Sequence, residues 1–176
     1  QLRVPGAFNV SNAACALAAA VELGVDVDDA LRGMRTVTSP AGRFATTTMH
    51  GTTVRLLLAK NPAGWAEALP LAASDPVILA IDSVAADGKD VSWLWDVDYE
   101  QLQGREVIAT GPRAQDLAVR LSYAEVEHRV IPDLAAAVAA GRSVSTSTPA
   151  PGSPAAPIDT LATYTPFQKL LKMAGL

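Results

Sequence analysis

The feature that most constrains the fold of this chain is an alternation of short apolar runs with helix-forming runs across its second half. Runs that predict strands cover residues 76–81, 105–110, 127–131 and 142–147. Runs with helical spacing of apolar residues cover residues 112–122 and 132–140. Strand and helix in regular alternation predict βαβ units. We therefore expect an α/β fold, with a Rossmann-like, mainly parallel sheet flanked by helices.

A β-hairpin is predicted ahead of this alternation. Arg43 to Met49 and Thr52 to Ala59 are rich in β-branched residues, and His50-Gly51 between them is typical of a turn. Pro62 then suits the first turn of a helix that runs to about Ala73. At the other end of the chain, a helix is predicted for Thr165 to Ala174.

Two further segments predict a loop and a domain boundary. Thr146 to Pro157 contains only Ser, Thr, Pro, Ala and Gly, which predicts a mobile loop. Near the beginning, Ser39-Pro40-Ala41-Gly42 separates two predicted helices from the strand-rich part. We therefore expect residues 1–40 to be the end of one domain and residues 41–176 to be a second domain, in a chain that is a piece of a longer protein.

The first predicted helix, Asn9 to Gly24, is rich in alanine and leucine and is expected to be buried. Asn9, Ser11 or Asn12 can cap its first turn. Asn9 and Asn12 also lie one helical turn apart, so both amides can point to one side and pair with a purine edge. The residues alone leave both interpretations open. The second helix, Asp26 to Met34, carries acidic residues in its first turn, where the helix dipole favours them.

Composition excludes several classes of function. There are 14 Lys and Arg against 18 Asp and Glu, for a net charge of -4, and no basic cluster, which argues against a nucleic-acid partner. Cys15 is the only cysteine, so no internal disulfide or zinc ribbon is expected, and Cys15 itself is predicted to lie in the core. The most apolar run, Ala13 to Val21, is too short to cross a bilayer.

Polar groups follow the predicted strands, where open α/β sheets bind ligands. Lys60 and Asn61 stand just before a helix, a place that suits phosphate or carboxylate, although an exposed turn explains them equally well. A longer acidic segment contains Trp93 and Trp95 and five aspartates: Asp82, Asp87, Asp90, Asp96 and Asp98. Such a segment is typical of a ligand or partner site. The alternative is a solvated acidic loop whose tryptophans fill the core; no histidine accompanies it, and no metal site is expected.

These motifs resemble those of the Mur ligases. Pro5-Gly6-Ala7-Phe8-Asn9-Val10-Ser11-Asn12-Ala13 is similar to the end of the Mur ligase central domain, and Gly42-Arg43-Phe44 to the entry of the C-terminal domain. Two narrower stretches, residues 58–64 and 86–100, resemble the C-terminal domain of the MurT-type branch. The resemblance continues from Thr110-Gly111 to Tyr164-Thr165. It departs at Asp82-Ser83-Val84, where the branch often has Asn-Asp-Asn, so no role is carried over to Asp82 or Ser83.

The resemblance implies an ATP-dependent amide ligase subunit of peptidoglycan biosynthesis. With a GatD-type glutamine amidotransferase as partner, such a subunit converts D-glutamate of the lipid II stem peptide to D-isoglutamine. Its ATP and Mg site is expected mostly upstream of these residues, so this piece alone is expected to be inactive. The single cysteine suits a reducing cytoplasm, and any membrane contact is expected to be peripheral, at the inner face.

The same resemblance implies roles for single residues. An adenine-contacting asparagine falls on Asn12, with Asn9 in support, and an aspartate that completes the Cys-His pair of the partner falls on Asp90, the predicted catalytic residue. Lys60 and Asn61 fall on a loop that faces the substrate cleft. Two other functions remain open: a non-catalytic docking module for a partner subunit, and a Mur-type ligase that adds an amino acid.

Overall fold

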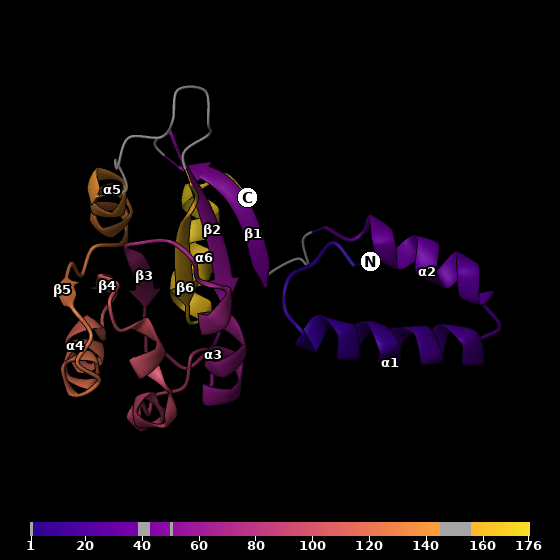
Figure 1. Cartoon of the computed structure of the whole chain (residues 1–176), viewed down its shortest axis with the longest axis horizontal. Helices are drawn as coiled ribbons and strands as arrows, with labels where there is room; N and C mark the ends of the chain where they lie inside the picture. The colour runs from indigo at the N-terminus through magenta and orange to yellow at the C-terminus, as the bar shows by residue number, and fades with distance from the viewer. Residues whose placement is uncertain (1, 39–42, 50, 145–155) are drawn as a thin grey trace. The chain divides into compact units, whose positions relative to one another are not determined.

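The computed structural model of this chain describes residues 2–38, 43–49, 51–144 and 156–176 (Figure 1). The chain divides into two compact units, residues 1–41 and 42–176. We call them the helical unit and the sheet unit and describe each by itself. None of the helices in the described ranges is both long and apolar enough to cross a membrane.

The helical unit consists of α1 (Phe8–Glu22) and α2 (Val27–Thr36). The Asp26 carboxylate caps α2 by accepting hydrogen bonds from the Asp28 and Asp29 amides at 2.9 and 3.2 Å. Asp28 and Asp29 stand in the first turn, where their charges offset the helix dipole. The prediction for this second helix is therefore confirmed.

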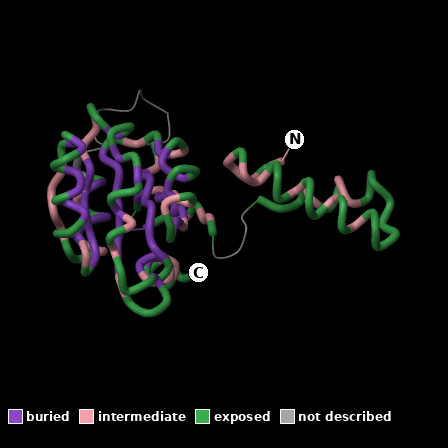
Figure 2. Tube along the Cα trace, turned by 90° about the horizontal axis from the view of Figure 1, so that it is seen from below, coloured by how far each residue is buried: buried purple, intermediate pink, exposed green. Residues whose placement is uncertain are grey.

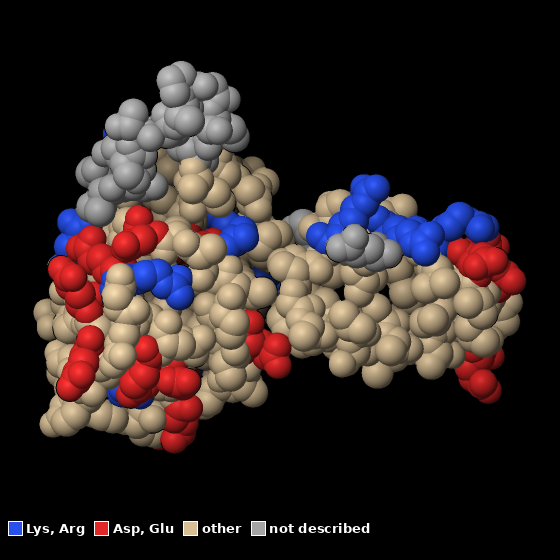
Figure 3. Space-filling view, viewed as in Figure 1, with Lys and Arg blue, Asp and Glu red and all other residues tan. Residues whose placement is uncertain are grey.

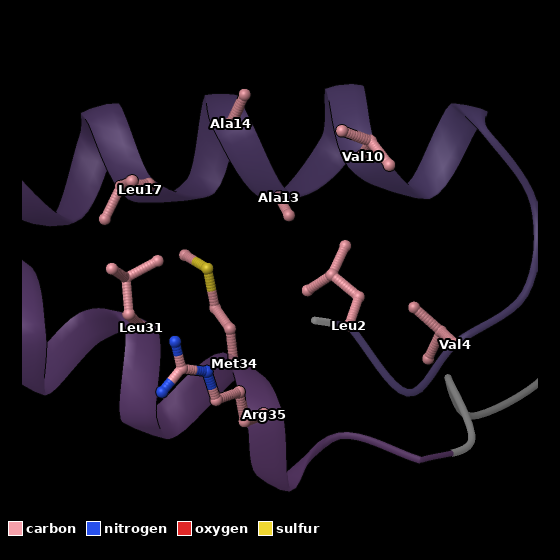
Figure 4. Close-up of a pocket in the computed structure, with 9 residues that line it drawn as sticks. All are labelled: Leu2, Val4, Val10, Ala13, Ala14, Leu17, Leu31, Met34 and Arg35. Carbon is pink, nitrogen blue, oxygen red and sulfur yellow. The ribbon is translucent and has the colours of Figure 1, made fainter.

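The prediction that the first helix is buried is wrong. No residue of α1 is buried, and Cys15, expected in the core, is exposed. A groove of about 520 Å³ is lined by apolar residues of α1, of α2 and of residues 2–4 (Figure 4): Leu2, Val4, Val10, Ala13, Ala14, Leu17, Leu31 and Met34. Because α1 packs against only one helix within its unit, the small alanine side chains on its other sides remain in contact with solvent.

In the described part of the sheet unit, six strands form one sheet in the order β1-β2-β6-β3-β4-β5. The strands are β1 (Phe44–Met49), β2 (Thr52–Leu58), β3 (Val77–Ala80), β4 (Val107–Thr110), β5 (His128–Val130) and β6 (Ile158–Ala162). β1 and β2 form the predicted antiparallel hairpin, with Met49 opposite Thr52, and every other pair of neighbours is parallel. The mainly parallel α/β sheet is confirmed. His50, in the predicted turn, lies outside the described residues.

Helices cover both faces of this sheet (Figure 1). They are α3 (Pro62–Ala68), α4 (Ala114–Tyr123), α5 (Leu134–Val144) and α6 (Tyr164–Met173), with short 3-10 helices η1 (Leu69–Leu71), η2 (Ser92–Asp96) and η3 (Tyr99–Leu102). Neighbouring residues of one strand belong to opposite cores: Leu79 packs with Trp65 and Leu117 on one face, whereas Ile78 packs with Phe167 on the other. Figure 2 shows the buried strands at the centre of the unit. This alternation follows from the period of two in a strand.

The structure corrects one predicted strand and adds another. Residues 142–144, predicted to begin a strand, continue α5, and the rest of that run lies outside the described residues. The added strand is β6, which lies between β2 and β3 at the centre of the sheet although it was not predicted. The predicted loop over 146–157 falls almost entirely outside the described residues, so its mobility stays a prediction.

Every residue of β6 is buried, including Asp159 and Thr160. The Asp159 carboxylate accepts hydrogen bonds from Arg55 Nε at 2.5 Å, from the Ala73 amide at 2.6 Å and from the Ser74 amide at 2.9 Å. A buried carboxylate is tolerated only with such compensation. This network therefore ties the central strand to β2 and to the segment that follows η1.

Candidate functional site

The candidate site lies where the parallel strands of the sheet end. We call this side of the sheet the carboxyl edge. Lys60 and Asn61 follow β2, Asp82 follows β3, Gly111 follows β4 and Thr163 follows β6. The strand ends are in direct contact, because the Thr163 hydroxyl accepts a hydrogen bond from the Asp82 amide at 3.0 Å and the Ile81 amide donates to Thr110 O at 3.0 Å. Ligands of open α/β sheets bind at this edge.

Lys60 and Asn61 are exposed at the start of α3. Asn61 Oδ1 accepts a hydrogen bond from the Gly64 amide at 2.8 Å, so Asn61 is the N-cap of this helix. The Lys60 ammonium has no ion pair among the described residues, and it remains available to an anion at the carboxyl edge.

The five aspartates of the acidic segment have different environments. Asp82 and Asp87 are buried. Asp82 accepts from the Ser83 amide at 2.8 Å and lies 3.5 Å from Lys169 Nζ. Asp87 Oδ1 accepts from the Thr165 amide at 2.8 Å, in the first turn of α6, while Asp87 Oδ2 is buried without a hydrogen-bond partner in the described structure. These two carboxylates hold the acidic segment against α6.

Asp90, in contrast, is exposed. Its Oδ1 accepts a hydrogen bond from the Ser92 amide at 2.8 Å, and its Oδ2 accepts from the Ser92 hydroxyl at 3.0 Å. These hydrogen bonds favour the charged form and hold the pKa of Asp90 below its ordinary value. Asp90 therefore presents an oriented, ionised carboxylate at the surface, two residues before η2.

The two tryptophans of the acidic segment also differ. Trp93 is half-buried and packs against the buried Trp65, with ring centroids 6.1 Å apart. Trp95 is 54% exposed and meets Tyr123 of α4 edge to face, with centroids 5.2 Å apart. The core-filling interpretation is therefore correct for Trp93 and wrong for Trp95.

Arg120 of α4 holds the acidic segment in place through hydrogen bonds. The sequence did not predict this role. Arg120 is buried, and its Nη2 donates to Val97 O at 2.8 Å and to the Glu100 carboxylate at 2.9 and 3.0 Å. Its guanidinium lies 5.8 Å from the Trp95 ring centroid and 5.5 Å from that of Tyr99. The hydrogen bond from Arg120 lowers the pKa of Glu100, and burial raises the pKa of Tyr99. Periodicity gives no signal for this role, since an arginine on a surface helix usually faces solvent.

Asn9 and Asn12 lie inside α1, whose N-cap is Ala7, so the capping interpretation of these asparagines is wrong. Asn9 Nδ2 donates to Pro5 O at 2.5 Å, and Asn12 Nδ2 lies 3.4 Å from Asn9 Oδ1. The two amides are therefore adjacent, and Asn12 is exposed. They belong to the helical unit, whereas the carboxyl edge belongs to the sheet unit.

Neither a nucleophile-histidine pair nor a metal cluster accompanies these residues within the described ranges. His128 Nδ1 lies 2.8 Å from Val126 O, its neighbour on the chain. No group of three His, Cys, Asp or Glu side chains in the described ranges could hold a metal ion. Within the described ranges, the predicted site residues of the sheet unit therefore include a fixed carboxylate at Asp90 and, at Lys60, a cation without an ion pair.

Comparisons with known proteins agree with these motifs. The MurT ligase C-terminal family matches residues 58–167. The MurT subunit of the glutamine-hydrolysing lipid II isoglutaminyl synthase of Staphylococcus aureus is 35% identical over 138 residues, which are 74% of this chain and 32% of that protein. The corresponding subunit of Streptococcus pneumoniae is 32% identical over 127 residues, or 68% of this chain and 28% of that protein. The chain thus spans about a third of the length of these relatives.

The fold has a solved counterpart. A crystal structure of MurF from Acinetobacter baumannii aligns with a TM-score of 0.59 at 16% identity, covering 97% of this chain and 37% of that one. At that identity the likeness concerns the fold alone. The family match, in contrast, runs from Leu58 at the end of β2 to Phe167 in α6 and so includes the Asp90 segment. The resemblance drawn from the sequence is confirmed: this chain belongs to the MurT ligase C-terminal family.

Proposed function

We propose that this chain is the C-terminal part of an ATP-dependent amide ligase subunit of peptidoglycan synthesis, acting in the cytoplasm or peripherally at the inner face of the membrane. With a GatD-type glutamine amidotransferase, it would amidate the α-carboxyl of D-glutamate in the lipid II stem peptide. The observation that carries the proposal is the exposed, ionised Asp90, which lies in the segment shared with the MurT family.

In this proposal the partner subunit hydrolyses glutamine with a Cys-His pair, and Asp90 completes that pair. A carboxylate beside a histidine holds the imidazole in one tautomer and stabilises its protonated form. Ser92 orients the Asp90 carboxylate before the partner binds, so little conformational freedom is lost on association. Asp90 would therefore act in the active site of the partner.

The helical unit is proposed to be the end of the ATP-binding domain. ATP would activate the substrate carboxyl by phosphorylation, and ammonia would then displace phosphate to form the amide. Asn12, supported by Asn9, fits an adenine edge, because its exposed amide offers both a donor and an acceptor. Lys60 and Asn61 are proposed to face the substrate, with the Lys60 ammonium near a phosphate or carboxylate. No residue of this chain is assigned to the Mg that the family resemblance implies.

Asn12→Ala in the full-length ligase is expected to weaken ATP binding by about 1 to 2 kcal/mol, the scale of one or two lost hydrogen bonds. The melting temperature should not change, because Asn12 does not cap α1. Isothermal titration calorimetry with ATP measures the affinity, and Ser11→Ala, an exposed neighbour in the same helix, is the matched control. Unchanged affinity for ATP in Asn12→Ala would exclude the adenine contact.

Reconstitution tests the function as a whole. The full-length ligase, the amidotransferase subunit, ATP, glutamine and lipid II are combined, and the stem peptide is analysed by mass spectrometry. Conversion of the D-glutamate carboxyl to an amide is the expected product, and it should require both ATP and the ligase. A peptide lengthened by one amino acid would instead identify an amino-acid-adding ligase. Amidation that proceeds without ATP would exclude the ATP-dependent ligase. The remaining function would then be a non-catalytic docking module for the partner subunit.

A further inference from the structure

We propose that Trp95, Val119 and Tyr123 form the docking surface of this chain for the amidotransferase subunit, and that the matching surface of that subunit has an apolar centre with a basic rim. We call these three residues the aromatic patch. The identity of the partner rests on the proposed function. The location of the surface and the chemistry of its partner rest on the contacts described below.

The aromatic patch is a set of large apolar side chains in contact with solvent. Trp95 is 54% exposed, Val119 52% and Tyr123 74%. Val119 and Tyr123 are four residues apart in α4 and so lie on one face of that helix. The rings of Tyr123 and Trp95 meet at 71° with centroids 5.2 Å apart, which joins α4 to η2. Clustered exposed aromatic residues of this kind mark protein interfaces.

The Trp95 ring of the patch lies against a buried arginine. The buried Arg120 guanidinium lies 5.8 Å from the centroid of the Trp95 ring and is itself fixed by Val97 O and the Glu100 carboxylate. A ring already held in place loses little rotamer entropy when a partner covers it. Trp95 is therefore preorganised for binding.

The surroundings of the patch are acidic. Close to the patch along the chain, Asp96, Glu125 and Glu127 are exposed and have no ion pair among the described residues. Figure 3 shows acidic side chains gathered over the region of α4 and the short 3-10 helices. Complementarity therefore requires basic residues at the rim of the partner surface. A two-fold contact between two copies of this chain would oppose these acidic groups to one another, which disfavours self-association through the patch.

The patch is continuous with Asp90. Asp90 accepts both hydrogen bonds from Ser92, the first residue of η2, and Trp95 lies in the same short helix. At about 2 Å of rise per residue, positions 90 and 95 are on the order of 10 Å apart along the chain. An interface of standard size covers about 800 Å² on each partner, which is large enough to include both Asp90 and Trp95.

The test measures the affinity of the full-length ligase for the amidotransferase subunit by isothermal titration calorimetry. Trp95→Ala and Tyr123→Ala are each expected to raise Kd by about 10- to 100-fold, as for interface hot spots. Tyr123→Phe, which keeps the ring, is the matched control and should bind like the wild type. Asp96→Lys should also weaken binding, and the association rate of the wild type should fall as salt is added. Because Tyr123 is so exposed, its variants should keep the wild-type melting temperature.

Wild-type affinity in both Trp95→Ala and Tyr123→Ala would overturn the docking surface while leaving the amidotransferase as partner. A wild-type dimer that these variants convert to monomers, seen by light scattering, would overturn the proposal by assigning the patch to a second copy of the chain. Ammonia-dependent amidation by the wild-type ligase without its partner tests the proposed function separately. If that reaction is present and the amidotransferase still does not bind, the docking proposal alone is wrong.

Discussion

Asp90→Asn in the full-length ligase, assayed with the proposed amidotransferase partner, is expected to lose most glutamine-dependent amidation and to regain activity when ammonia is supplied. Asparagine has nearly the same shape as aspartate but no charge, so it cannot stabilise a protonated imidazole. Loss of the corresponding aspartate in catalytic triads slows turnover by up to about 10⁴-fold. In the proposed function, ammonia bypasses glutamine hydrolysis, and the ligation chemistry does not use Asp90.

The measurements for this variant are glutamate release from glutamine, amide formation with glutamine and with ammonium, and the Kd of the complex. Binding should be close to that of the wild type. Asp116→Asn removes an exposed carboxylate that is paired with Arg113 and serves as the control for a change of charge. Wild-type glutamine hydrolysis in Asp90→Asn would reject the assignment. Asp96 would then be the next candidate, because Asp87 is buried against α6.

Ser92 offers an independent check on Asp90 through pH. The hydrogen bonds from Ser92 lower the pKa of Asp90, so the carboxylate stays charged to lower pH than an ordinary aspartate. Ser92→Ala removes the hydroxyl donor and should move the acid limb of the glutaminase pH profile toward higher pH. An acid limb that does not move in this variant would mean that another group controls it.

Asp159→Ala is expected to lower the free energy of unfolding of the sheet unit by about 3 to 5 kcal/mol, the cost of breaking a buried ion pair on one side. The change leaves the Arg55 guanidinium without its carboxylate and leaves the Ala73 and Ser74 amides without their acceptor. Guanidinium chloride denaturation followed by circular dichroism measures the loss.

The control for Asp159→Ala is Asp116→Ala, which breaks the exposed pair with Arg113 and should cost at most about 1 kcal/mol. A second variant, Arg55→Met, separates the charge from the two amide hydrogen bonds, because it leaves the amide bonds to Asp159 in place. If Asp159→Ala is as stable as Asp116→Ala, then the Asp159 network does not hold the central strand.

The arrangement of elements could largely be predicted from local patterns. Strands β3 and β4 are apolar runs, β5 lies in the alternation of strand and helix that follows them, and the hairpin of β1 and β2 is a β-branched run on each side of a glycine turn. Residues a few positions apart determine these features, so a single sequence reveals them. The family motifs at 58–64 and 86–100 are also continuous stretches of sequence, so they can be recognised without a structure. They are sufficient to identify the MurT family.

Contacts between distant parts of the chain decided the features that local patterns do not predict, namely strand β6 and the environment of each side chain in the acidic segment. β6 escaped prediction because Asp159 and Thr160 interrupt its apolar pattern, and the compensating Arg55 lies 104 positions away. The acidic segment likewise looks uniform in sequence. Contacts with Thr165 and Arg120, which lie in other helices, determine which of its side chains are buried and which are exposed. A buried charge is stable only beside its partner, and partners brought together by folding leave no periodic trace along the chain. Sequence alone therefore determined the family and the parallel sheet, whereas tertiary structure decided the central strand and the exposure of Asp90 and Trp95.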